Sequence, residues 1–70
     1  MPAGVTIGQR FRDRIAVWNV WEVARIYSDF VGLPHAVVIN VADPTDTRTL
    51  ASGCLRDRRR FTRAAARLAP

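Results

Sequence analysis

The clearest pattern in the chain is the apolar run "HAVVINVA" at residues 35–42. It is short and β-branched, and Pro34 and the Asp43-Pro44 pair bound it, which is typical of a strand. "DPTD" then supplies Asp and Pro at the positions that a type I turn favours. Because "TRTLA" at residues 47–51 is a second strand-like run, we predict a hairpin with a loop of about four residues.

Two segments before this hairpin also predict regular structure. "QRFRDRI" at residues 9–15 alternates Phe11 with charges and predicts an edge strand. Residues 17–32, "VWNVWEVARIYSDFVG", fit two structures. Their helical spacing of apolar residues, with Asn19 three positions before Glu22, fits a helix over about 19–31. Their β-branched and aromatic content favours a strand or a bent hairpin, which we prefer because the neighbouring segments are strands.

The last part of the chain also has two interpretations. "SGCL" suits one turn of 3₁₀ helix, and "RRFTR" then forms a last short strand. A helix that begins at Asp57 would instead place Phe61, Ala65 and Leu68 on one face and arginines on the other.

The order of these elements predicts a mostly β fold, a small five-stranded SH3-like barrel with one 3₁₀ turn before the last strand. Residues 1–63 form this single domain, and residues 64–70 form a tail that is disordered or extends a helix. The alternative is an α+β fold with a helix at about 19–31, a C-terminal helix, or both.

A set of core and turn residues runs through nearly the whole chain in the same order. It consists of Gly8, Phe11, "WEV" at 21–23, "PHAVV" at 34–38, "TRTLA" at 47–51, Leu55 and Phe61. In this pattern the chain resembles short uncharacterised bacterial and phage proteins. The resemblance implies a small SH3-like β-barrel and brings no catalytic residue with it.

The size of the chain limits what it can be. Its 70 residues allow one domain with a thin margin of stability. Cys54 is the single cysteine, which excludes an intrachain disulfide and fits a reducing compartment. The N-terminus shows no secretory signal, and the longest apolar run is too short to cross a bilayer. We therefore expect a cytoplasmic protein without a membrane partner.

The charge of the chain is unevenly distributed. All 11 basic residues are arginine, and the net charge is +5. Residues 1–55 carry equal numbers of arginines and acids, so the whole excess lies in residues 56–70, where Asp57 is the only acid. Arginine binds phosphates through a planar fork, and an aromatic ring can stack on a base. This segment therefore predicts a nucleic-acid contact through Arg56, Arg58, Arg59, Arg60 and Arg63, with a solvated charged edge as the alternative.

Large aromatic residues predict a second kind of contact. Trp18, Trp21, Tyr27 and Phe30 lie within thirteen residues, and so small a domain buries only two or three of them. We expect Trp21 and Phe30 in the core, with Trp18 and Tyr27 along the surface. Trp18, Trp21 and Tyr27 are the candidates for a protein interface or a homodimer.

The remaining reactive residues do not form a catalytic or metal-binding pattern. His35 and Cys54 lie on different predicted elements, and a structural zinc site needs more sulfur and imidazole ligands than these two. Asp43 and Asp46 flank a turn rather than a calcium loop. We therefore predict a binding module and not an enzyme, without cofactor, metal or small-molecule substrate.

Overall fold

The computed structural model describes residues 4–65, which form five strands and one short helix. The elements, in chain order, are β1 (Arg10–Asp13), β2 (Val20–Ser28), β3 (Pro34–Asn40), β4 (Asp43–Ala51), α1 (Ser52–Leu55) and β5 (Phe61–Ala64).

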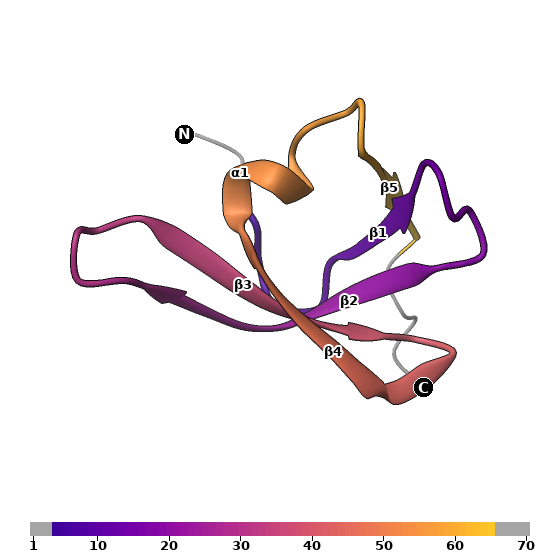
Figure 1. Cartoon of the computed structure of the whole chain (residues 1–70), viewed down its shortest axis with the longest axis horizontal. Coiled ribbons are helices and arrows are strands. Elements are labelled where there is room, and N and C mark those ends of the chain that lie inside the picture. Colours follow the sequence, from indigo (N-terminus) through magenta and orange to yellow (C-terminus); the bar gives the residue numbers. More distant parts are fainter. Residues whose placement is uncertain (1–3, 66–70) are drawn as a thin grey trace.

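The five strands form one twisted antiparallel sheet in the order β4-β3-β2-β1-β5 (Figure 1). The chain meanders from β1 to β4, and α1 then leads back to β5, which pairs with β1. The mostly β prediction is confirmed. β4 and β5 are the two edges, and among the described strands no ladder joins them, so the sheet is not closed into a barrel.

The segment with two interpretations is strand β2, so the helix over 19–31 is wrong. Trp21 pairs with Asn40 and Val23 with Val38, and these four side chains are buried on the inner face of the sheet. The register then shifts between Val23 and Arg25, and Ile26 returns to the inner face opposite Ala36. This β-bulge explains why apolar residues do not alternate strictly along β2 and therefore imitate helical spacing.

The turn between β3 and β4 lies earlier in the chain than predicted. Val41 and Ala42 make the connection, and Asn40 holds it by accepting the Ala42 N–H at 3.0 Å. The predicted turn "DPTD" lies inside β4, where the register with β3 shifts. The hydrogen bonding typical of an Asp-initiated turn is still present, because the Asp43 carboxylate accepts hydrogen bonds from the backbone N–H and the hydroxyl of Thr45.

The first strand is not an edge strand, in contrast to the prediction. β1 pairs with β2 on one side and with β5 on the other. Phe11 points into the core opposite Trp21, which explains the alternation of this residue with charges. The edge positions belong instead to β4 and β5.

A single helical turn before the last strand is confirmed in place but is α-helical rather than 3₁₀. The N–H of Arg56 donates to Ser52, four residues back, at 3.3 Å, and Leu55 closes over the core. β5 then begins at Phe61, so a helix from Asp57 is wrong for the described residues. The predicted C-terminal tail falls largely on residues 66–70, which lie outside the described residues.

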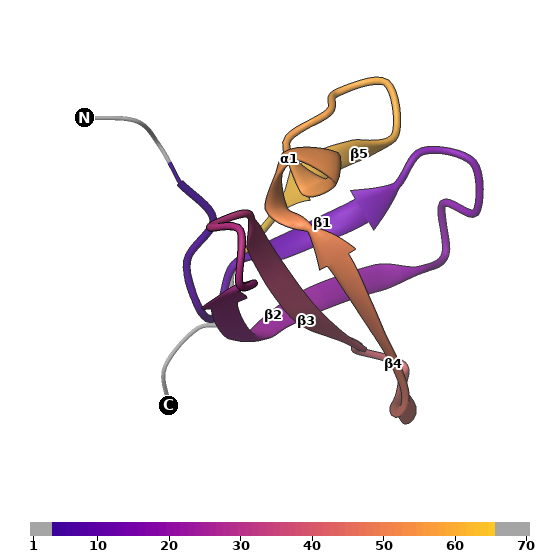
Figure 2. The ribbon, with the colours of Figure 1, turned by 60° about the vertical axis from the view of Figure 1, so that its left-hand side comes forward.

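The core lies between the inner face of the sheet and α1 (Figure 2). It consists of Phe11, Trp21, Val23, Ala36, Val38, Leu55 and Phe61. Phe30, expected in the core, is 100% exposed in the connection between β2 and β3. No helix within residues 4–65 is long and apolar enough to cross a membrane.

Candidate functional site: an arginine-lined pocket

Two adjoining depressions share one wall of arginine side chains. The larger, of about 320 Å³, and the smaller, of about 180 Å³, are both lined by Phe11, Arg56, Arg58 and Arg63. Arg14, Leu55, Phe61 and Thr62 complete the larger depression. We call the two together the arginine pocket. Among the described residues it contains four arginines and no acidic side chain, so it concentrates positive charge.

The segment that carries these arginines is folded by Asp57. The Asp57 carbonyl accepts hydrogen bonds from the N–H groups of Arg60 and Phe61, and its carboxylate accepts the N–H of Arg59 at 3.0 Å. The side-chain and backbone hydrogen bonds from Arg59 hold the pKa of Asp57 below its usual value. The one acid of the basic segment thus shapes the turn and does not line the pocket.

Arg14 reaches the pocket from the connection between β1 and β2. Its guanidinium donates to the carbonyl of Arg58 at 2.9 Å, and its N–H donates to the carbonyl of Arg60 at 2.9 Å. Asp13 pairs with Phe61 in the β1–β5 ladder, which brings the following Arg14 to the basic segment. Arg14 is not among the predicted contact residues, because only the long-range pairing of β1 with β5 joins the two arginine groups.

The five predicted arginines do not act as one set. Arg56, Arg58 and Arg63 line the pocket, whereas Arg59 and Arg60 do not. Arg59 binds the Asp57 carboxylate with its guanidinium, at 3.2 Å from Nε. Arg60 lies with its guanidinium 5.9 Å from the ring centre of Phe61.

The aromatic rings beside the pocket are covered. Phe11 and Phe61 are only 3% and 7% exposed, and the guanidinium of Arg63 lies 5.8 Å from the ring centre of Phe11. A base needs an open ring face to stack on, and these rings offer none. The pocket can therefore bind an anionic group such as a phosphate but cannot stack a base on Phe11 or Phe61.

The three predicted interaction aromatics lie away from the pocket and in different surroundings. Trp21 is buried at 2% exposure, with the Arg48 guanidinium 4.6 Å from its ring centre, and presents no surface to a partner. Tyr27 is partly exposed and stacks on His35 at 5.4 Å. Trp18 is 74% exposed in the connection between β1 and β2.

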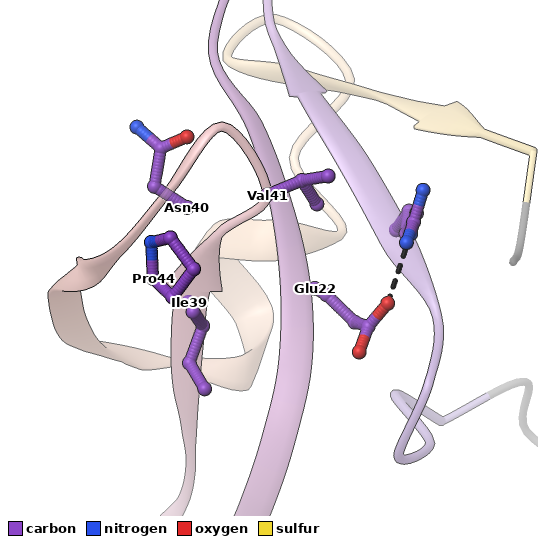
Figure 3. Close-up of a pocket in the computed structure, with 6 residues that line it drawn as sticks. Glu22, Ile39, Asn40, Val41 and Pro44 are labelled. Atoms are coloured by element: carbon purple, nitrogen blue, oxygen red, sulfur yellow. Dashed lines mark hydrogen bonds and ion pairs between the residues drawn. The ribbon is translucent and has the colours of Figure 1, made fainter.

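A third depression, of about 230 Å³, is neutral (Figure 3). Its lining includes Arg10 and Glu22, whose side chains form an ion pair at 2.9 Å. Ile39, Val41 and Pro44 make up its apolar part. Since its one cation is already matched by a carboxylate, this depression lacks the unbalanced charge that distinguishes the arginine pocket.

The two residues considered for catalysis, His35 and Cys54, lie on different elements, β3 and α1. His35 Nε2 lies 2.9 Å from Asp29 Oδ2, and Asp29 also accepts the N–H groups of Val31 and Leu33 in the connection between β2 and β3. Cys54 is a free thiol, partly buried on α1. Within residues 4–65 no three His, Cys, Asp or Glu side chains come together as metal ligands.

Comparison with protein-family models, with curated proteins and with solved structures gives no match to this chain.

Proposed function

We propose that this protein is a small non-enzymatic binding module that contacts nucleic acid through the arginine pocket. The observation that carries the proposal is the convergence of Arg56, Arg58 and Arg63 on one pocket that no carboxylate of residues 4–65 lines. Phosphate is the anion that such a cluster of planar, permanently charged donors suits best. The strand order, with the last strand returning to the first, supports an SH3-like architecture for the module.

The covered rings define the kind of binding. Because Phe11 and Phe61 are buried, the pocket would contact the phosphate backbone rather than stack on bases. Contacts of this kind carry no sequence information and release counterions, so affinity falls steeply as salt rises. We therefore propose a sequence-independent contact, with dissociation constants of about 10⁻⁴ to 10⁻⁶ M at physiological salt.

A titration with labelled oligonucleotides, followed by fluorescence anisotropy at several salt concentrations, tests the proposal. The pocket variant Arg56→Ala/Arg58→Ala should lose two phosphate contacts. Its plot of log K against log salt should flatten by about 1.4 for single strands or about 1.8 for duplexes. The control Arg12→Ala/Arg25→Ala removes the same charge at two exposed arginines that do not line the pocket and should keep most of the slope.

Equal losses in the two double variants would show that net charge alone drives binding and would refute the role of the pocket. Absence of binding by the unmodified protein at low salt would refute the nucleic-acid proposal itself. Strong dependence on base composition would contradict a backbone contact.

Exposed apolar side chains favour association with another protein as a second candidate function. Trp18 and Phe30 are 74% and 100% exposed, and the connections that carry them project at opposite ends of the molecule (Figure 1). Exposed large aromatics are typical of protein interfaces. Binding of this kind would be nearly independent of salt, and Trp18→Ala or Phe30→Ala would abolish it without affecting nucleic-acid binding.

A further inference from the structure

Strand β4 is a free edge of the sheet. β3 occupies one side of it, and Figure 2 shows no other described element along the outer side of its length. A free edge presents unpaired backbone N–H and C=O groups that another strand can bind. The other edge, β5, has only four residues, which include Arg63 and no acid.

The sequence of β4 is complementary to itself. Residues 45–49 read Thr-Asp-Thr-Arg-Thr, so an antiparallel copy centred on Thr47 places Asp46 opposite Arg48 and Arg48 opposite Asp46. Thr45 and Thr49 then face each other. Directly opposed side chains in such a pair lie about 4.5–5.5 Å apart at Cβ, close enough for an ion pair.

Asp46 and Arg48 are placed to make these contacts. Arg48 pairs with the buried Val38 in the β3–β4 ladder, and its guanidinium lies over Trp21, so it projects from the inner face. Asp46 lies on the same side, since its carboxylate is near the Asn40 amide at 3.4 Å. Their side chains are 36% and 56% exposed, and they approach each other within the chain only to 3.8 Å.

Charge also selects one register. A shift of the symmetry axis by one residue, to Asp46 or to Arg48, places two like charges directly opposite each other, which is unfavourable. The ladder is limited at both ends, because the two-fold axis places Pro44, which has no N–H, and Thr45, whose N–H is already bound by Asp43, at each of them. The contact is therefore short, and a weak dimer is expected.

We propose that two copies of this chain associate through their β4 edges, antiparallel about Thr47, into a continuous ten-stranded sheet held in register by two pairs of Asp46 with Arg48. This proposal is independent of the proposed nucleic-acid contact and of the exposed aromatics. It assigns the interface to a charged edge strand.

Sedimentation equilibrium of the full chain from about 10 μM to 1 mM, with amide NMR spectra over the same range, tests the proposal. The amide signals of residues 45–49 should shift as the dimer forms. Asp46→Arg and Arg48→Asp each turn both attractive pairs into repulsive ones, and each should weaken the dimer roughly ten- to a hundredfold. An equimolar mixture of these two variants restores opposite charges at both pairs and should associate at least as well as the unmodified protein.

The control Arg25→Asp makes the same charge change as Arg48→Asp on the exposed part of β2 and should leave the dimer unchanged. The charge-exchanged chain Asp46→Arg/Arg48→Asp keeps both pairs and should dimerise even if either single variant folds poorly. A monomer at 1 mM, a mixture no better than its components, or loss of the dimer in the exchanged chain would overturn the proposal. Signal shifts confined to the connections that carry Trp18 and Phe30 would overturn it too.

Discussion

The leucine that α1 inserts into the core provides a direct test of how this small fold is held together. Leu55 is 1% exposed, and it is the one member of the core cluster that α1 contributes. Leu55→Ala removes three carbon atoms, equivalent to about 2.4 kcal/mol at about 0.8 kcal/mol per carbon. The cavity that remains raises the expected loss in unfolding free energy to about 3 kcal/mol.

This loss is large for so short a chain. A domain of 70 residues has an unfolding free energy of about 7 kcal/mol at about 0.1 kcal/mol per residue. The variant therefore still folds, with about 4 kcal/mol left. With a urea dependence of about 1 kcal/mol per M, its unfolding midpoint should fall by about 3 M. The fluorescence of the buried Trp21 reports the transition.

Leu33→Ala is the matched control, because it makes the same change at a side chain that is 58% exposed. Its unfolding free energy should change by no more than about 0.5 kcal/mol. A loss of less than about 1 kcal/mol in Leu55→Ala would refute the packing of α1 against the sheet. So would equal losses in the two variants.

Two further predictions concern the connection between β2 and β3. Gly32 has φ +86°, so Gly32→Ala should lower the free energy of unfolding by about 1–2 kcal/mol. Gly53→Ala in α1, where φ is not positive, should instead raise it by about 0.4–1 kcal/mol. Urea unfolding measures both, and equal effects of the two variants would contradict the role of the positive φ. The side-chain hydrogen bond to His35 is the largest cause that lowers the pKa of Asp29, so His35→Ala should raise this pKa toward 3.8 in a carboxyl NMR titration, and an unchanged midpoint would contradict it. Because the folded-state pKa is lowered, Asp29 contributes stability above about pH 3.8 and loses it as the pH falls through the lowered pKa.

Local patterns predicted most of the strands. The β-branched run of β3 and the strand character of residues 47–51 follow from side-chain preferences that act within a few residues. The position of the helical turn and of the strand at Phe61 follows in the same way. The turn between β3 and β4 was misplaced because the turn-forming "DPTD" is accommodated by a register shift within β4 instead of reversing the chain.

The arginine pocket was predicted only in part, for a different reason. The basic segment is visible as an uneven distribution of charge along the chain. Whether each arginine points into a common pocket depends on contacts between distant residues, such as the hydrogen bond from Arg14 to Arg58. Arg59 does not line the pocket, because its guanidinium binds the carboxylate of Asp57, which shapes the turn.

The amino-acid pattern alone therefore favours a β-rich domain, and it establishes the surplus of arginine after residue 55 and the self-complementary order of charges in residues 45–49, since all of these are properties of neighbouring residues. Only the folded chain decides which aromatics are covered. Trp21 is buried because β1 and β3 flank it in register, and Phe30 is exposed because it lies beyond the end of β2. Side-chain alternation groups residues by face, but the pairing of distant strands determines which face encloses the core.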